Sequence, residues 1–136
     1  MAAKKNILAL DVGDRRVGVA LADSQIKIAV PYGYLERSDK VIQQITELML
    51  DHDIDTLVIG YPRNQSGEAT KQTESVEQFA KELAEIEIDA DLVCQDESLS
   101  SVEAERRLGR VKDKGEIDAE AASIILQDYL EQNYAD

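Results

Sequence analysis

Three places in the sequence put a carboxylate where it could serve in catalysis. Asp11 ends the apolar run of residues 7–10, Asp96 and Glu97 follow the apolar residues 92–94 after one glutamine, and Asp118 falls in the first turn of a predicted helix. Carboxylate oxygens gathered around one point are the ligands with which proteins hold Mg²⁺ or Mn²⁺. Two such ions activate water and stabilise the leaving oxygen in phosphodiester cleavage. If the fold gathers these acids, the sequence predicts metal-dependent hydrolysis.

Each acid, taken singly, also has an ordinary structural interpretation. Asp11 precedes a valine and a glycine, where an aspartate commonly initiates a turn. Asp96, Glu97 and Asp118 stand near the starts of predicted helices, where the helix dipole stabilises negative charge. The catalytic hypothesis therefore depends on the three positions meeting in space.

The chain has one histidine, His52, and one cysteine, Cys94. A histidine-rich or thiolate metal site and a disulfide framework are excluded, and a histidine-activated nucleophile is a poor fit. No run approaches the roughly 20 apolar residues of a membrane helix, and the start of the chain lacks the apolar stretch of a signal peptide. We therefore expect a cytoplasmic protein that has no membrane partner.

The basic residues are unevenly distributed in an acidic chain. A formal net charge of −13 over 136 residues repels phosphate polymers at long range, so any nucleic-acid site must be local. Five of the 15 lysines and arginines lie between positions 106 and 114, and two more follow Asp11 in a predicted hairpin. Cations at a helix end are the alternative interpretation. We predict that phosphates are bound by Arg15, Arg16, Arg106, Arg107, Arg110, Lys112 and Lys114.

The elements that must position these residues follow from the apolar pattern. The order βββ-α-β-α-β-α-α predicts an α/β fold in one domain, residues 1–136, with a mixed five-stranded sheet covered by helices on both faces. A three-strand meander followed by strand–helix alternation is the arrangement of a ribonuclease H-like fold. Pro31 predicts that the third strand is an edge strand. The expected strands are 7–10, 17–21, 27–35, 56–59 and 92–94, and the expected helices are 41–49, capped by Ser38 or Asp39, 70–86, 100–108 and 116–129.

A polar loop of residues 60–67 follows the predicted strand 56–59. Functional loops gather at the carboxyl ends of strands in open sheets, so we expect Asn64 to face the same cleft as the acids and to contact nucleic acid. The alternative interpretation is a turn asparagine.

Four ordered motifs, in residues 10–20, 58–67, 96–105 and 117–126, together resemble the YqgF family of RuvX-type Holliday junction resolvases, also described as nucleases of precursor 16S ribosomal RNA. The resemblance implies a ribonuclease H-like fold and a metal-dependent nuclease that uses Mg²⁺ or Mn²⁺, acting in ribosome biogenesis or on branched DNA. The family's catalytic and metal-binding acids map onto Asp11, Glu97 and Asp118. The chain departs from the family pattern at Ser98, where arginine is usual, and at Tyr61, where leucine is usual.

The sequence leaves three alternatives open. The substrate is either junction DNA or precursor ribosomal RNA, because both present the same phosphate backbone to the same acids. The protein is either a monomer or a homodimer, and paired cuts across a symmetric junction require the dimer. A protein that binds structured RNA as an assembly factor without cleaving it is the alternative to an enzyme.

Overall fold

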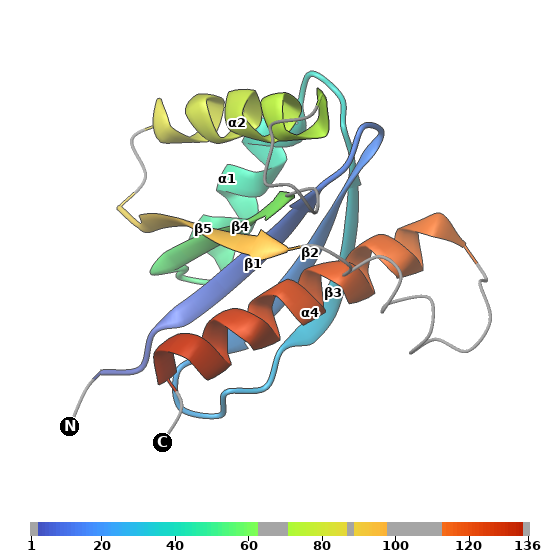
Figure 1. Cartoon of the computed structure of the whole chain (residues 1–136). Coiled ribbons are helices and arrows are strands. Elements are labelled where there is room, and N and C mark those ends of the chain that lie inside the picture. The colour runs from blue at the N-terminus through green and yellow to red at the C-terminus, as the bar shows by residue number, and fades with distance from the viewer. Residues whose placement is uncertain (1–2, 63–70, 87–88, 98–112, 135–136) are drawn as a thin grey trace.

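The computed structural model describes residues 3–62, 71–86, 89–97 and 113–134. The described residues form a five-stranded sheet of order β3-β2-β1-β4-β5, with helices on both faces (Figure 1). The sheet confirms the predicted α/β class and strand–helix order. The elements are β1 (Asn6–Val12), β2 (Arg16–Asp23), β3 (Val30–Glu36), α1 (Val41–Asp51), β4 (Thr56–Pro62), α2 (Lys71–Ala84), β5 (Asp91–Glu97) and α4 (Lys114–Tyr134).

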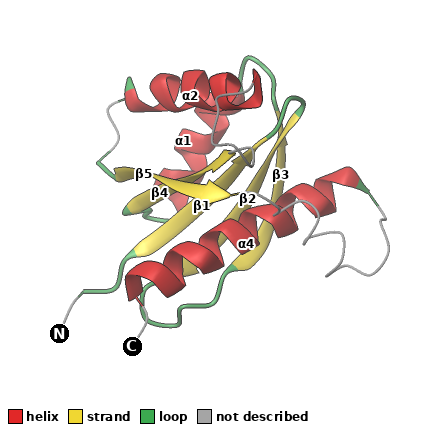
Figure 2. Ribbon diagram, in the orientation of Figure 1, coloured by secondary structure: helices red, strands yellow, loops and turns green. Residues whose placement is uncertain are grey.

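The central strand β1 is apolar because helices cover it on both faces. Ile7, Leu8, Ala9 and Leu10 have no exposed surface. Leu8 and Leu10 pack in the core beneath α1 and α2, whereas Ile7 and Ala9 pack in the core beneath α4. Figure 2 shows α1 and α2 on one face of the sheet and α4 on the other. Two separate cores thus fix the sheet between two helical layers.

The first three strands form the predicted antiparallel meander. A tight hairpin joins β1 to β2, and the Gly13 amide donates to the Arg16 carbonyl at 2.9 Å. Pro31 lies on β3, which is an edge strand as the sequence predicts. The register of β3 against β2 shifts at Val19 and Ala20, which marks a bulge.

Strands β1, β4 and β5 run parallel, so their carboxyl ends lie at one edge of the sheet. β4 and β5 continue beyond the predicted ends at residues 59 and 94, because ladder pairs extend as far as Pro62 with Glu97. The predicted strand ends were wrong because the apolar signal stops before the backbone pairing does. The extension brings Glu97 to the end of β5 itself.

The cap of one predicted helix and the start of another differ from the structure. Lys40 is the N-cap residue of α1 and no side chain caps that helix, so the predicted cap by Ser38 or Asp39 was wrong. α4 begins at Lys114, two residues earlier than predicted, because the Asp113 carboxylate accepts a hydrogen bond from the Glu116 amide at 2.8 Å. Lys114 is therefore the first residue of a helix and not part of a loop.

The helix predicted at 100–108 lies outside the described residues. In the described part of the chain, no helix is both long enough and apolar enough to span a bilayer.

Candidate active site

The carboxylate of Asp11 lies on the face of the sheet that α4 covers. Successive side chains of a strand alternate between the two faces, so Asp11 continues the row of Ile7 and Ala9 beneath α4. Asp11 is 8% exposed. It pairs directly with Gly18 on β2. The hairpin between β1 and β2 therefore holds an almost buried acid at the edge where the parallel strands end.

Gly18 is where the start of α4 meets the sheet beside Asp11. Directly opposed residues of an antiparallel pair send their Cβ atoms to the same face, about 4.5–5.5 Å apart. A Cβ added to Gly18 would overlap the backbone carbonyl of Asp118. The first turns of α4 thus lie over position 18, so the backbone of Asp118 packs on the residue that pairs with Asp11. The backbones of two of the three predicted acids thus meet at Gly18, and the convergence of their carboxylates stays a prediction.

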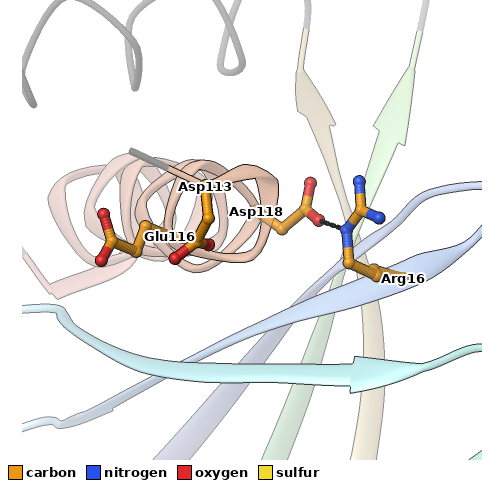
Figure 3. Close-up of polar contacts among 4 residues, drawn as sticks. All are labelled: Arg16, Asp113, Glu116 and Asp118. Atoms are coloured by element: carbon orange, nitrogen blue, oxygen red, sulfur yellow. Dashed lines mark hydrogen bonds and ion pairs between the residues drawn. The ribbon is translucent and has the colours of Figure 1, made fainter. Parts of the chain in front are cut away.

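Arg16 contacts the carboxylate of Asp118. Its Nε donates to Asp118 Oδ2 at 2.7 Å, and the two side chains are 24% and 22% exposed. Figure 3 shows the guanidinium of Arg16 reaching from the sheet to α4, whereas Glu116 points away from it. The hydrogen bond to Asp118 raises the pKa of Arg16 above its ordinary value. Arg16 therefore stays positively charged while it contacts one of the candidate acids.

The third acid, Glu97, is the last residue of β5 and pairs with Pro62 on β4. β5 is separated from β1 by β4 alone. The backbone of Glu97 thus reaches the same edge of the sheet as Asp11. The Glu97 side chain lies outside the described part of the structure, so the convergence of all three carboxylates stays a prediction.

The donors at this edge fit a divalent metal. Asp11 and Asp118 offer hard carboxylate oxygens, and Mg²⁺ is commonly bound through one or two carboxylates while it keeps several waters. Among the described residues, no group of three metal-binding side chains comes together. Asp11 and Asp118 are therefore the described pair that would hold Mg²⁺ or Mn²⁺, with Glu97 as the predicted further ligand.

The predicted phosphate-binding residues are described only in part. Arg15 is exposed in the hairpin after Asp11, and Lys114 is exposed at the start of α4. Arg16 contacts Asp118, as described above. The other predicted nucleic-acid contacts, Asn64, Arg106, Arg107, Arg110 and Lys112, lie outside the described residues.

Comparison with known proteins decides the family. The family model of RuvX, described as Holliday junction resolvase, matches residues 5–132. The chain belongs to the RuvX family. This confirms the resemblance drawn from the four sequence motifs.

Relatives of this RuvX-family chain carry the name "Putative pre-16S rRNA nuclease". One from Synechocystis sp. is 41% identical over 138 residues, covering 96% of this chain and 90% of the relative. One from Chloroflexus aurantiacus is 40% identical over 132 residues, covering 92% and 86%. One from Bacillus cereus is 38% identical over 135 residues, covering 93% and 98%.

A solved structure has a similar fold. It is RuvC of T. thermophilus in complex with a Holliday junction substrate, with a TM-score of 0.57, 10% sequence identity and coverage of 94% of each chain. The likeness confirms the predicted ribonuclease H-like arrangement.

Sequence reasoning missed two positions through which α4 of this RuvX-family chain packs on the sheet. Gly18 allows α4 to approach the sheet, and the available signal was a glycine inside an otherwise apolar strand. Gln95 is buried on β5, and its amide donates to Gln132 of α4 at 3.2 Å. No sequence signal marks Gln95, because a glutamine in an apolar segment gains its partner only when the helix packs.

Proposed function

We propose that this protein is a metal-dependent endonuclease that hydrolyses phosphodiester bonds of structured nucleic acid, with precursor 16S ribosomal RNA as the first substrate to test. The names of the relatives support that substrate class. The observation that carries the proposal is the packing of the Asp118 carbonyl on Gly18, directly opposite Asp11. That contact supports a site in which the carboxylates of Asp11 and Asp118 share one edge of the sheet.

Each acid has a definite part in this proposal. Asp11 and Asp118, with Glu97, would hold one or two divalent cations, which supply an activated water and stabilise the leaving oxygen. The low exposure of Asp11 strengthens its attraction for a cation, because less water screens the charge. The sheet fixes Asp11 through ladder pairing, and α4 fixes Asp118 through its backbone. Both acids are therefore oriented before substrate arrives.

The basic residues would hold the substrate against this edge. Arg15 and Lys114 are exposed near Asp11 and Asp118 along the chain. Binding through phosphates suits a chain of net charge −13, since local cations and bound metal neutralise the acidic centre. Phosphate contacts position a nucleic acid without reading its bases, so structure in the substrate would provide selectivity.

The test is cleavage by the pure protein of a precursor 16S ribosomal RNA fragment and a four-way DNA junction, side by side. Each substrate is incubated with Mg²⁺, with Mn²⁺ and with EDTA, using wild type and Asp11→Asn. We expect cleavage of the RNA that EDTA and Asp11→Asn each abolish.

Two other outcomes would redirect the proposal. Cleavage of the junction alone would make branched DNA the substrate. Binding of the RNA without cleavage under any metal condition would contradict the nuclease and favour the non-catalytic assembly factor.

A further inference from the structure

The contact between Arg16 and Asp118 is made by one nitrogen of the guanidinium. Nε donates to Oδ2 at 2.7 Å, and both side chains keep about a quarter of their surface exposed. Arginine–carboxylate pairs are frequently two-pronged, and the second hydrogen bond adds both energy and geometric specificity. A single-point, partly exposed contact can be exchanged for another cation without disturbing a core.

The position of this contact indicates why replacing Arg16 by another cation would matter for metal binding. Asp118 stands over Gly18, directly opposite the nearly buried Asp11. Two carboxylates that share a metal site repel each other unless a cation lies between or beside them. Arg16 provides one such positive charge, and a bound divalent metal would provide another.

We propose that Arg16 is an internal counter-ion that occupies Asp118 until a divalent cation takes over that carboxylate. The proposal rests on the proposed function, because it assumes that the metal binds at Asp11 and Asp118. A guanidinium and a divalent cation on the same carboxylate repel each other, so each weakens binding of the other. In this proposal the metal displaces Arg16 from Oδ2 when it binds.

The displacement has a consequence for substrate binding. A guanidinium released from Asp118 has five N–H donors in the geometry that matches phosphate oxygens. Arg16 begins β2, at the edge of the sheet where Asp11 ends β1. Metal loading thus turns a side chain engaged with the protein into a phosphate contact beside the acids.

The test measures binding of Mn²⁺ alone, by calorimetry and by water-proton relaxation, without nucleic acid. Arg16→Gln removes the competing cation, so its Kd for Mn²⁺ should fall about tenfold. Arg15→Gln removes the same charge from the same hairpin without touching Asp118, and its Kd should stay within about twofold of wild type. Arg16→Lys keeps the charge and should bind Mn²⁺ nearly as wild type does.

Several results would overturn the inference. An unchanged Kd in Arg16→Gln would show that Arg16 does not compete, and a weaker affinity would show that Arg16 instead orients Asp118 for the metal. If Asp11→Asn abolishes Mn²⁺ binding but Arg16→Gln leaves the Kd for Mn²⁺ unchanged, the proposed function still stands and this inference is wrong. If wild type binds no Mn²⁺, both fail.

A measurement on wild type covers the case in which Arg16→Gln does not fold. The Nε–H signal of Arg16 in ¹⁵N NMR spectra should shift during Mg²⁺ titration and exchange faster with water, since the bond to Asp118 is broken. A signal that stays unshifted while Asp118 resonances respond to Mg²⁺ would contradict the exchange.

Discussion

The backbone carbonyl of Asp118 packs directly against Gly18, so that any side chain at position 18 would overlap it. This contact fixes the distance between the start of α4 and the sheet. Because Gly18 pairs with Asp11, this single contact sets the separation between an acid on the first strand and an acid on the last helix. The geometry of the candidate site depends on a residue that has no side chain.

Gly18→Ala tests this dependence. The added methyl group has to push α4 away from the sheet, and overpacking of this kind typically costs about 1–3 kcal/mol of unfolding free energy. We expect that loss in urea denaturation, together with weaker Mn²⁺ binding, since Asp118 moves away from Asp11.

Gly33→Ala is the matched control, because a Cβ at Gly33 on β3 would meet nothing within 4 Å. Its unfolding free energy should stay within about 0.5 kcal/mol of wild type. Equal effects of the two substitutions would show that strand propensity, and not the approach of α4, explains the loss at position 18.

The cap at the start of α4 gives a second prediction. The Asp113 carboxylate satisfies the amide of Glu116, so Asp113→Ala should lower the unfolding free energy by about 1 kcal/mol. Asp39→Ala removes an acid at a comparable distance before α1, a helix without a side-chain cap, and should have little effect. Denaturant titration of both variants decides the matter, and equal losses would contradict the capping role.

A third prediction separates the basic segment from the acids. Replacing Arg110, Lys112 and Lys114 by alanine should weaken nucleic-acid binding and reduce the salt slope by up to about 2.7, since each duplex phosphate contact contributes about 0.9. Asp11→Asn should keep or improve binding while it abolishes cleavage, because it removes a negative charge that serves the metal. Fluorescence anisotropy at several salt concentrations measures both variants. An unaltered slope in the triple variant would move the nucleic-acid surface to Arg15 and Arg16.

The fourth prediction concerns Cys94 on β5. Cys94 is an exposed residue, but the loss of water from part of its thiol, followed by the charges of Asp96 and Glu77, raises the pKa of Cys94 above its ordinary value. The thiolate is the reactive form, so iodoacetamide should alkylate the folded protein more slowly at pH 8 than the urea-unfolded protein. The folded state holds this proton more tightly, so the associated stability is present at neutral pH and is lost as the pH rises through the folded pKa.

The single cysteine makes the alkylation rate unambiguous. Asp96→Asn removes the second cause of the raised pKa. The pH at the midpoint of the alkylation-rate profile should therefore move part of the way back to its value in the unfolded protein. Equal alkylation rates for the folded and the unfolded protein would contradict the raised pKa of Cys94.

The fold was predictable where burial dictates residue type. The apolar run of β1 has to be covered on both faces, and Pro31 cannot serve in a central strand, so both placements followed from composition. The ends of β4 and β5 were not predictable in the same way. Pro62 and Glu97 belong to strands because their backbones pair. The hydrophobicity of their side chains does not indicate that pairing.

The sequence marks the candidate acids as single positions, but it does not indicate which residues they contact. Asp11 stands out because a charge ends an apolar strand. The bond between Arg16 and Asp118 joins residues 102 positions apart, and no local pattern encodes it. The cap at Asp113 did have a signal, since an acid three residues before Glu116 is a capping pattern, but the surrounding cations favoured interpretation as a loop.

The distance along the chain between Arg16 and Asp118 has a consequence during protein synthesis. A ribosome adds about 5–20 residues per second, so about 5–20 s separate the appearance of the hairpin from that of the first turn of α4. During that interval the nascent chain holds Asp11 but lacks Asp118 and the helix that covers it. If the proposed function holds, an incomplete chain lacks one of the metal-binding acids, and cleavage of RNA has to wait until α4 has been made.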